Sequence, residues 1–202
     1  MAIAFIYVID SIIDLIRRFL FMKIEPVFAF VSNRIEKRWR GMKDRSKPKY
    51  LVMDVDGTMT DGKIYMGNTG ELFKAFNIKD GCGIHDILIP SGITPIIITG
   101  RESDIVLSRC KEIGIIEVYQ GVTNKIEKLL CITSDLSTVA YIGDDINDLP
   151  CMIPVKEAGG IIGCPKDAVR KVKDLADYIA DHNGGDGAVR DFIEWIFCEE
   201  GQ

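Results

Sequence analysis

The sequence predicts an α/β fold in which a parallel β-sheet lies between two layers of helices. Short apolar runs rich in Ile and Val alternate along the chain with segments whose apolar residues recur at helical spacing. Several of these runs end in Asp, Thr or Gly, which is typical of buried strands that run into loops. Because strands that alternate with helices pair in parallel, helices should cover both faces of the sheet.

The first predicted strand is the apolar run 50–53, and Asp54, Asp56 and Gly57 follow it. Ligands of a parallel sheet bind at the carboxyl ends of the strands, so both aspartates should stand at that edge. They point the same way if the strand stays extended, and Gly57 lets the backbone turn close to a ligand. A divalent cation would relieve their mutual repulsion, and an aspartate can serve as a nucleophile in phosphoryl transfer. Two solvated loop aspartates are the alternative.

A short β-hairpin is predicted next. Residues 63–65 and 72–76 flank the segment 66–70, whose Gly and Asn residues are typical of a hairpin turn. A helix over 84–89 follows, and Asp80 is a suitable N-cap residue ahead of it.

The second strand of the sheet is predicted over 93–98, and it ends in Thr99, Gly100 and Arg101. A hydroxyl at a strand end, followed by glycine and exposed backbone N–H groups, suits a phosphate. Arg101 could hold phosphate or a substrate carboxylate, or form an ion pair at the cap of the helix predicted over 102–113.

Two further strands, 115–119 and 138–142, are each followed by charged residues. Lys125 stands at a predicted helix N-terminus, where its charge opposes the helix dipole and an anion would compensate. Asp144 and Asp148 follow the other strand. Mg²⁺ prefers oxygen ligands and keeps several waters. Asp144 is therefore our candidate for a direct or water-linked ligand, and Asp148 for a carboxylate that orients it from behind.

The C-terminal part predicts a strand over 159–163, a helix over 165–172 and an edge strand over 178–180. The glycine-rich segment 183–190 leads into a helix whose apolar face carries aromatic residues. Glycine at this density normally marks a mobile loop.

Composition limits the class of protein. The chain has 202 residues, of which 47% are hydrophobic and 27% charged, which suits one globular domain. The net charge of −5 is uneven, because the segment 1–49 holds 11 basic and 5 acidic residues. The acidic remainder argues against nucleic acid as a partner. Six cysteines without a Cys-x-x-Cys pair predict reduced thiols and a cytoplasmic protein.

We divide the chain into an amphipathic and basic extension, 1–48, and a main domain, 49–202. The apolar start of the extension is interrupted by charges and is too short to span a bilayer. An apolar helix followed by a basic run could contact an anionic membrane surface. It could instead pack on the main domain or on a neighbouring subunit, or the true start could be Met42.

Residues 54–62, Asp-x-Asp-Gly-Thr-x-Thr-Asp-Gly, resemble the first motif of the haloacid dehalogenase (HAD) superfamily of phosphotransferases. More narrowly, they resemble the phosphatases of 3-deoxy-octulosonate 8-phosphate (Kdo 8-phosphate) and of nonulosonate 9-phosphates. Thr99-Gly, Lys125 and Gly-Asp144-Asp-x-x-Asp148 match the second, third and fourth motifs in order. The resemblance covers roughly 49–197 and implies a Rossmann-like three-layer HAD fold without a large cap domain.

The resemblance also implies a mechanism. Asp54 would attack phosphorus, and Mg²⁺ would be held by Asp54, the Asp56 carbonyl and Asp144. Thr99 and Lys125 would stabilise the equatorial phosphate oxygens. Asp56 would protonate the leaving oxygen and then activate water to cleave the aspartyl-phosphate.

By the same resemblance, the substrate is a sugar-acid phosphate. We rank Kdo 8-phosphate, a precursor in lipopolysaccharide biosynthesis, above an N-acylneuraminate or KDN 9-phosphate. The segment 77–83 resembles a family segment that borders the substrate pocket, so Lys79 could meet the sugar carboxylate and Asp80 lies beside it. In the family, the hairpin joins a homotetramer and the glycine-rich segment can cover a neighbour's active site.

Two non-enzymatic interpretations of the sequence remain open. A receiver domain also uses an acidic cluster with Thr and Lys, but its acceptor aspartate follows a later strand, and here the strand 115–119 is followed by Gln120 and Gly121. An idle oligomerisation module should have lost an acid, whereas Asp54, Asp56 and Asp144 are all present.

Overall fold

The computed structural model describes residues 48–198. The predicted extension over 1–48 lies almost entirely outside these residues, so the division of the chain at 48/49 stays a prediction. Within 48–198, no helix is long and apolar enough to cross a membrane.

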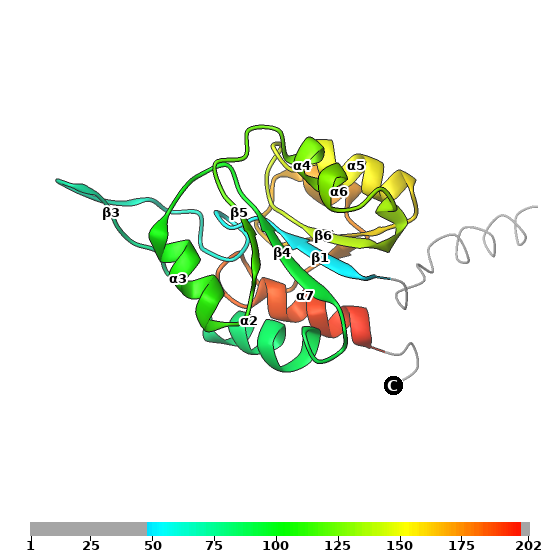
Figure 1. The fold of residues 1–202 in the computed structure, drawn as a ribbon, viewed down its shortest axis with the longest axis horizontal. Helices are drawn as coiled ribbons and strands as arrows, with labels where there is room; N and C mark the ends of the chain where they lie inside the picture. The colour runs from blue at the N-terminus through cyan, green and yellow to red at the C-terminus, as the bar shows by residue number, and fades with distance from the viewer. Residues whose placement is uncertain (1–47, 199–202) are drawn as a thin grey trace, which may run out of the picture. The chain divides into compact units, whose positions relative to one another are not determined.

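A six-stranded parallel sheet forms the centre of the fold, in the order β5-β4-β1-β6-β7-β8 (Figure 1). Strand β1 lies between β4 and β6, with Met53 opposite Ile97 on one side and Ile142 on the other. The carboxyl ends of these three strands therefore meet at one point of the sheet edge, as the sequence predicts. The strands are β1 (Tyr50–Met53), β4 (Thr94–Ile98), β5 (Glu117–Tyr119), β6 (Val139–Ile142), β7 (Ile161–Cys164) and β8 (Tyr178–Ile179).

Helices cover both faces of the sheet, which confirms the predicted three layers (Figure 1). Alternate residues of β1 point to opposite faces: Leu51 and Met53 join the core under η1, α3 and α7, whereas Val52 joins the core under α4, α5 and α6. The helical elements are α2 (Ile78–Cys82), η1 (a π-helix, Gly83–Leu88), α3 (Asp104–Glu112), α4 (Lys125–Ile132), η2 (a 3₁₀ turn, Leu136–Thr138), α5 (Leu149–Glu157), α6 (Arg170–Leu175) and α7 (Ala188–Phe197).

The predicted hairpin is present as β2 (Tyr65–Gly67) and β3 (Gly70–Phe73), which form a separate antiparallel pair. Its strands extend into the predicted turn 66–70, so that only residues 68–69 connect them. It projects from the body of the fold at the left of Figure 1. Tyr65 stacks on Phe73 across the pair, with 4.3 Å between ring centroids. A hairpin of this size adds no cap domain between β1 and β4.

Two helix predictions are wrong. The helix predicted over 84–89 begins earlier, and its N-cap is Asn77, whose Oδ1 accepts a hydrogen bond from Lys79 N at 2.8 Å. Asp80 lies inside that helix, and its carboxylate instead accepts a hydrogen bond from Arg190 N at the start of α7. The helix predicted over 165–172 begins only at Arg170.

Candidate active site

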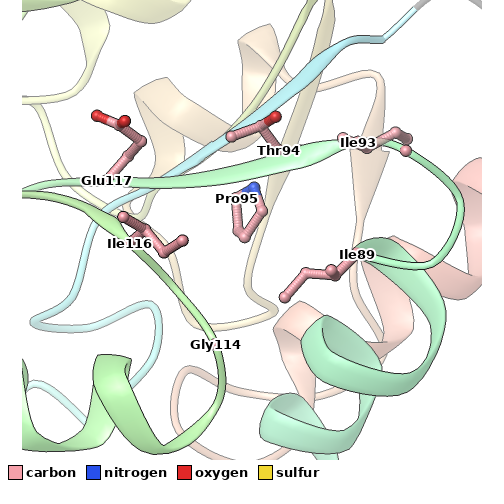
Figure 2. Close-up of a pocket in the computed structure, with 8 residues that line it drawn as sticks. Ile89, Ile93, Thr94, Pro95, Gly114, Ile116 and Glu117 are labelled. Atoms are coloured by element: carbon pink, nitrogen blue, oxygen red, sulfur yellow. The ribbon is translucent and has the colours of Figure 1, made fainter.

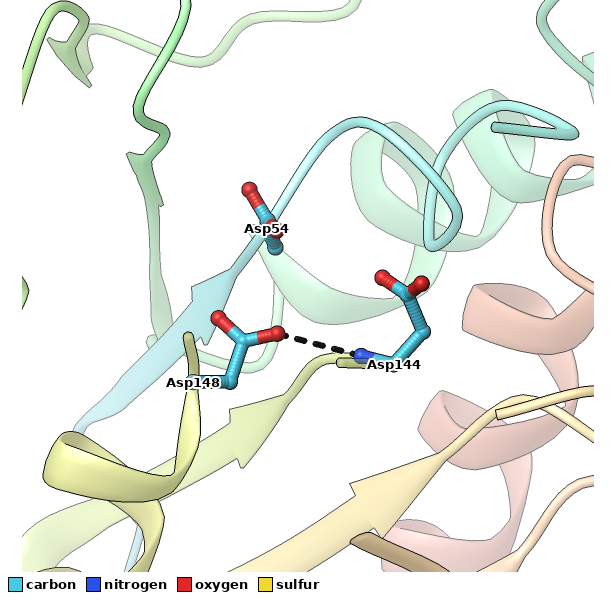
Figure 3. Close-up of side chains that lie close together, drawn as sticks. All are labelled: Asp54, Asp144 and Asp148. Carbon is cyan, nitrogen blue, oxygen red and sulfur yellow. Dashed lines mark hydrogen bonds between the residues drawn. The ribbon is translucent and has the colours of Figure 1, made fainter. Parts of the chain in front are cut away.

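Asp54 follows β1 and Asp144 follows the neighbouring strand β6, so the parallel pairing of these strands brings the two side chains together. Oxygens of Asp54, Asp144 and Asp148 lie within 4.8 Å of one another (Figure 3). Asp54 Oδ1 accepts a hydrogen bond from Val55 N at 2.7 Å, and Asp144 Oδ1 accepts one from the Thr58 hydroxyl at 3.0 Å.

Asp148 plays a different part in this cluster, because both of its oxygens already have donors. Its Oδ1 accepts from Lys125 Nζ at 2.7 Å and from the Tyr141 hydroxyl at 2.9 Å. Its Oδ2 accepts from the backbone N–H groups of Asp144 and Asp145, at 3.1 and 3.4 Å. With its acceptor sites engaged and its side chain fully buried, Asp148 is suited to orient the loop after β6, which leaves Asp54 and Asp144 to face a ligand.

Two glycines make room for these carboxylates. Gly57 has φ +95°, and a Cβ placed there would lie 2.1 Å from Asp144 Oδ2. A Cβ at Gly143 would lie 2.3 Å from Asp148 Oδ2. Only glycine therefore allows both loops to approach so closely.

The charges of the cluster leave an excess of negative charge. Burial, reinforced by the charge of Asp148, raises the pKa of Asp54 to about 6. Burial and the charges of Asp148 and Asp54 raise the pKa of Asp144 to about 7. One buried cation, Lys125, lies 3.0 Å from Asp54 Oδ2, and the two carboxylates beside it raise its pKa although burial opposes this. Three carboxylates against one lysine fit a divalent cation with oxygen ligands.

Asp56 belongs to a second charged group beside the cluster. The buried Lys74 Nζ donates to Asp56 Oδ1 and lies 3.0 Å from Glu71 Oε1. Arg101 lies 3.2 Å from the same Glu71 oxygen, and its Nε is 3.9 Å from Asp56 Oδ2. Burial raises the pKa of Glu71, but the Ser103 hydroxyl and the two cations outweigh it and lower the pKa.

Lys74 and Glu71 were missed by the sequence reasoning. Glu71 lies in β3 and Lys74 directly follows that strand, and nothing in the spacing of the chain marks either residue.

Comparison with known proteins shows the family to which the chain belongs. No protein-family model matches it. The curated 3-deoxy-D-manno-octulosonate 8-phosphate phosphatase of Salmonella typhi is 40% identical over 158 residues, which make up 76% of this chain and 81% of the relative. The chain belongs to the Kdo 8-phosphate phosphatase family.

Solved structures of Kdo 8-phosphate phosphatases have the same fold. The enzyme from Yersinia pestis is 40% identical with a TM-score of 0.69, over 76% of this chain and 82% of that one. The enzyme from Moraxella catarrhalis, solved with a magnesium ion, a phosphate ion and Kdo, is 38% identical with a TM-score of 0.69, over 76% and 88%. A HAD-superfamily hydrolase from Legionella pneumophila is 32% identical with a TM-score of 0.68, over 81% and 90%. The predicted HAD fold is thus confirmed.

The remaining predicted site residues lie in different places in this Kdo 8-phosphate phosphatase family member. Thr99 is buried at the carboxyl end of β4, beside β1, and the exposed Gly100 follows it. Lys79 instead lines a cavity of about 280 Å³ with residues of α7 and of the loop before it. Asp80 Oδ1 accepts from Arg190 N at 2.8 Å at the start of α7, and burial raises the Asp80 pKa to about 6.

The glycine-rich segment packs against the loop after β1 of its own chain. Gly185 N donates to Thr58 O at 3.1 Å, and a Cβ at Gly184 would lie 1.9 Å from Gly57 O. Gly184 N also donates to Asp167 Oδ1 at 2.9 Å. These contacts hold the segment against the loop that carries Thr58, the partner of Asp144.

A further cavity of about 320 Å³ lies at the amino ends of the strands, opposite the end that carries the carboxylate cluster (Figure 2). Thr94 and Glu117, which line it, are the first residues of β4 and β5. Most of its other lining residues are apolar: Ile89, Ile93, Pro95 and Ile116. This cavity is larger than the one beside Lys79, but it is mostly apolar and does not contain the carboxylate cluster. We therefore take the carboxylate cluster as the candidate active site.

Proposed function

We propose that this chain hydrolyses Kdo 8-phosphate to Kdo and phosphate in a Mg²⁺-dependent reaction that passes through an aspartyl-phosphate on Asp54. The observation that carries the proposal is that Asp54 and Asp144 meet at the carboxyl ends of the adjacent strands β1 and β6, with Lys125, the first residue of α4, 3.0 Å from Asp54 Oδ2. It is supported by relatives that are named Kdo 8-phosphate phosphatases. The Moraxella catarrhalis relative was solved with the ion and with both products of such a reaction.

The side chains of Asp54 and Asp144, together with the Asp56 carbonyl, would hold the magnesium ion. When bound, it would offset negative charge between the nucleophile and the phosphate. Asp148 would orient Asp144 by accepting a hydrogen bond from the Asp144 backbone N–H.

The side chains of this chain carry the bond changes. An Asp54 carboxylate oxygen attacks phosphorus while the bond from phosphorus to the sugar oxygen breaks, and Asp56 gives its proton to that oxygen. Asp56 then takes a proton from water, whose oxygen attacks phosphorus and releases phosphate from Asp54. Thr99 and the buried Lys125 would stabilise the equatorial oxygens in both steps.

We propose that Arg101, with Gly100 beside it, and Lys79, beside Asp80, recognise the phosphate and the sugar carboxylate. The Arg101 side chain is 39% exposed, and its contacts with Glu71 and Asp56 leave further guanidinium donors that can receive an anion.

A panel of Kdo 8-phosphate, N-acetylneuraminate 9-phosphate, its deaminated analogue and hexose phosphates tests the assignment of the substrate through Mg²⁺-dependent phosphate release. Preference for Kdo 8-phosphate is expected, whereas preference for a nonulosonate phosphate would change the substrate but not the chemistry.

We also propose that the protein is a homotetramer joined through the β2–β3 hairpin. The hairpin region carries several exposed apolar side chains, which are Ile64, Met66, Leu72 and Phe73. A group of this kind on a projecting element commonly marks a protein interface. Light scattering should give four chains for the wild type and fewer for Leu72→Glu, and a wild-type monomer at micromolar concentration would contradict the proposal.

The cytoplasm is the proposed location. Cys110, Cys151 and Cys164 are buried free thiols, and the other three cysteines are free and exposed. Free thiols persist in a reducing compartment. Cell fractionation with thiol labelling should recover the protein in the cytoplasmic fraction with all six cysteines reduced.

A further inference from the structure

Each of the two carboxylates that follow β1 has a buried lysine of its own. Lys125 contacts Asp54, and Lys74 contacts Asp56. We propose that Lys74 is a positioning residue for Asp56: it fixes one carboxylate oxygen so that the other is presented to the leaving oxygen and later to water. The inference rests on the proposed function, in which Asp56 transfers these protons.

The burial of Lys74 argues against a merely solvated charge. Its side chain is 1% exposed, whereas those of Asp56 and Glu71 are 22% and 14% exposed. A buried ammonium group is costly unless it is paired and hydrogen-bonded. Lys74 meets this requirement by lying between two carboxylates, one from the loop after β1 and one from β3. Lys74 therefore links the end of β3 to the loop that carries Asp56.

Lys74 is itself held in place by its second carboxylate. Glu71 Oε1 also binds Arg101, and Glu71 Oε2 accepts a hydrogen bond from the Ser103 hydroxyl at 2.7 Å. The hairpin is therefore tied to the start of α3, and Lys74 is held by the anchored carboxylate of Glu71. Supporting contacts of this type hold a reactive side chain in one orientation.

The two oxygens of Asp56 differ as a result. Oδ1 accepts directly from Lys74 Nζ. Among residues 48–198, Oδ2 has only the longer contact of 3.9 Å with Arg101 Nε. Oδ2 is thus the oxygen that can exchange a proton with the leaving group and with water. Without Lys74, the Asp56 carboxylate could rotate, and both proton transfers would lose their geometry.

Substrates with different leaving groups separate the two transfers. When the phosphorus–oxygen bond of a sugar phosphate breaks, the alkoxide needs the proton of Asp56. The nitrophenolate of p-nitrophenyl phosphate leaves without a proton, so only cleavage of the aspartyl-phosphate by water then needs Asp56. A misplaced Asp56 should slow phospho-enzyme formation from the sugar phosphate selectively and let phospho-enzyme accumulate from p-nitrophenyl phosphate.

The test uses the full chain as wild type, Lys74→Met, Asp56→Asn as the reference for complete loss, and Lys111→Met as a control on the exposed surface of α3. Rapid quenching and mass spectrometry of the protein measure phospho-enzyme. For Lys74→Met we expect formation from the sugar phosphate to fall by about 10- to 100-fold, a fraction of a general acid's usual contribution. Formation from p-nitrophenyl phosphate should change by less than about threefold, with phospho-enzyme accumulating, and Lys74→Arg should recover part of the loss.

An equal loss with both substrates, without accumulation of phospho-enzyme, would overturn the inference. If Lys74→Met does not fold, Glu71→Gln decides the question, because it removes the negative charge that helps to hold Lys74 and should give the same pattern more weakly. Failure of the proposed function is a separate outcome: in that case the wild type and Lys111→Met would release no phosphate from any sugar-acid phosphate.

Discussion

Lys125 and Asp148 form a buried ion pair beneath the candidate active site, with 2.7 Å between Nζ and Oδ1. The same Lys125 nitrogen lies 3.0 Å from Asp54 Oδ2, so one cation serves both the candidate nucleophile and the carboxylate that orients the loop after β6. A buried pair of this kind is tolerated when further hydrogen bonds satisfy it, and the Tyr141 hydroxyl supplies one to Asp148. Lys125 should therefore contribute both to the stability of the site, through Asp148, and to its chemistry, through Asp54.

Lys125→Met should weaken both properties. Two nearly fully buried carboxylates would lose their cation, which we expect to lower the free energy of unfolding of the metal-free protein by about 3 kcal/mol. Loss of its charge near the phosphate should lower kcat by about 100-fold. Urea denaturation and phosphate release measure the two effects, and Lys171→Met, on the exposed surface of α6, is the control. Activity within threefold of wild type would show that Lys125 does not act on the phosphate.

Gly57→Ala should displace Asp144. A Cβ at this position would lie 2.1 Å from Asp144 Oδ2, in a backbone conformation with φ +95°. Gly92→Ala is a matched control, since its φ is +88° and nothing lies within 4 Å of its added Cβ. Both variants should lose about 1 kcal/mol of stability through backbone strain. Only Gly57→Ala should lose Mg²⁺ affinity, by at least about tenfold, as calorimetry would detect. Equal affinities in the two variants would argue against Asp144 as a ligand.

The sequence predicts those parts of the site that depend on local pattern. Asp54, Thr99 and Asp144 each follow a short apolar run, and parallel pairing of adjacent strands then places them at one edge. Contacts between distant segments leave no local signal. Asp80 is a residue type that commonly caps the helix that follows it, yet its carboxylate accepts a hydrogen bond from the backbone of Arg190, 110 residues away. Lys74 reads as a surface charge because its burial depends on how the hairpin folds back onto Asp56.

The start of α6 shows the same limit. The composition of 165–172 favours a helix, but Val169 N donates to Asp144 O at 2.9 Å and Asp167 accepts from Gly184 N. These tertiary contacts hold residues 165–169 as a loop, and the helix begins only at Arg170. Tertiary hydrogen bonds have overridden local propensity here.

Asp80→Ala should destabilise the fold through α7. The Asp80 carboxylate accepts backbone hydrogen bonds at the start of that helix, and Gly187, which precedes it, has no side chain to do so. We expect the free energy of unfolding to fall by about 1–2 kcal/mol. Asp80→Asn keeps an acceptor oxygen, so it should lose less than half as much, and near pH 8 it also avoids a buried charge. Chemical denaturation of the two variants compares them, and equal losses would show that capping is not the cause.

Magnesium binding should strengthen as pH rises from about 5 to 8. Burial and neighbouring carboxylates raise the pKa of Asp144 to about 7 in the metal-free protein, so a bound cation must displace a proton at pH 6. Because this pKa lies above its value of 3.8 in the unfolded chain, the free energy of unfolding of the metal-free protein should fall as pH rises from about 4 to 7. Calorimetry in buffers of different ionisation enthalpy measures the protons released. Binding at pH 6 without proton release would contradict the prediction.

The most direct measurement is Mg²⁺-dependent release of phosphate from Kdo 8-phosphate by the wild type and by Asp54→Asn. Our account predicts turnover by the wild type and a loss of at least about 1,000-fold in the variant, because an amide cannot form the covalent intermediate. Asp54→Asn should still fold, since the acceptor oxygen for Val55 N is retained. Release by a folded Asp54→Asn within tenfold of the wild-type rate, or no release by the wild type, would contradict the proposal that Asp54 is the nucleophile of a Kdo 8-phosphate phosphatase.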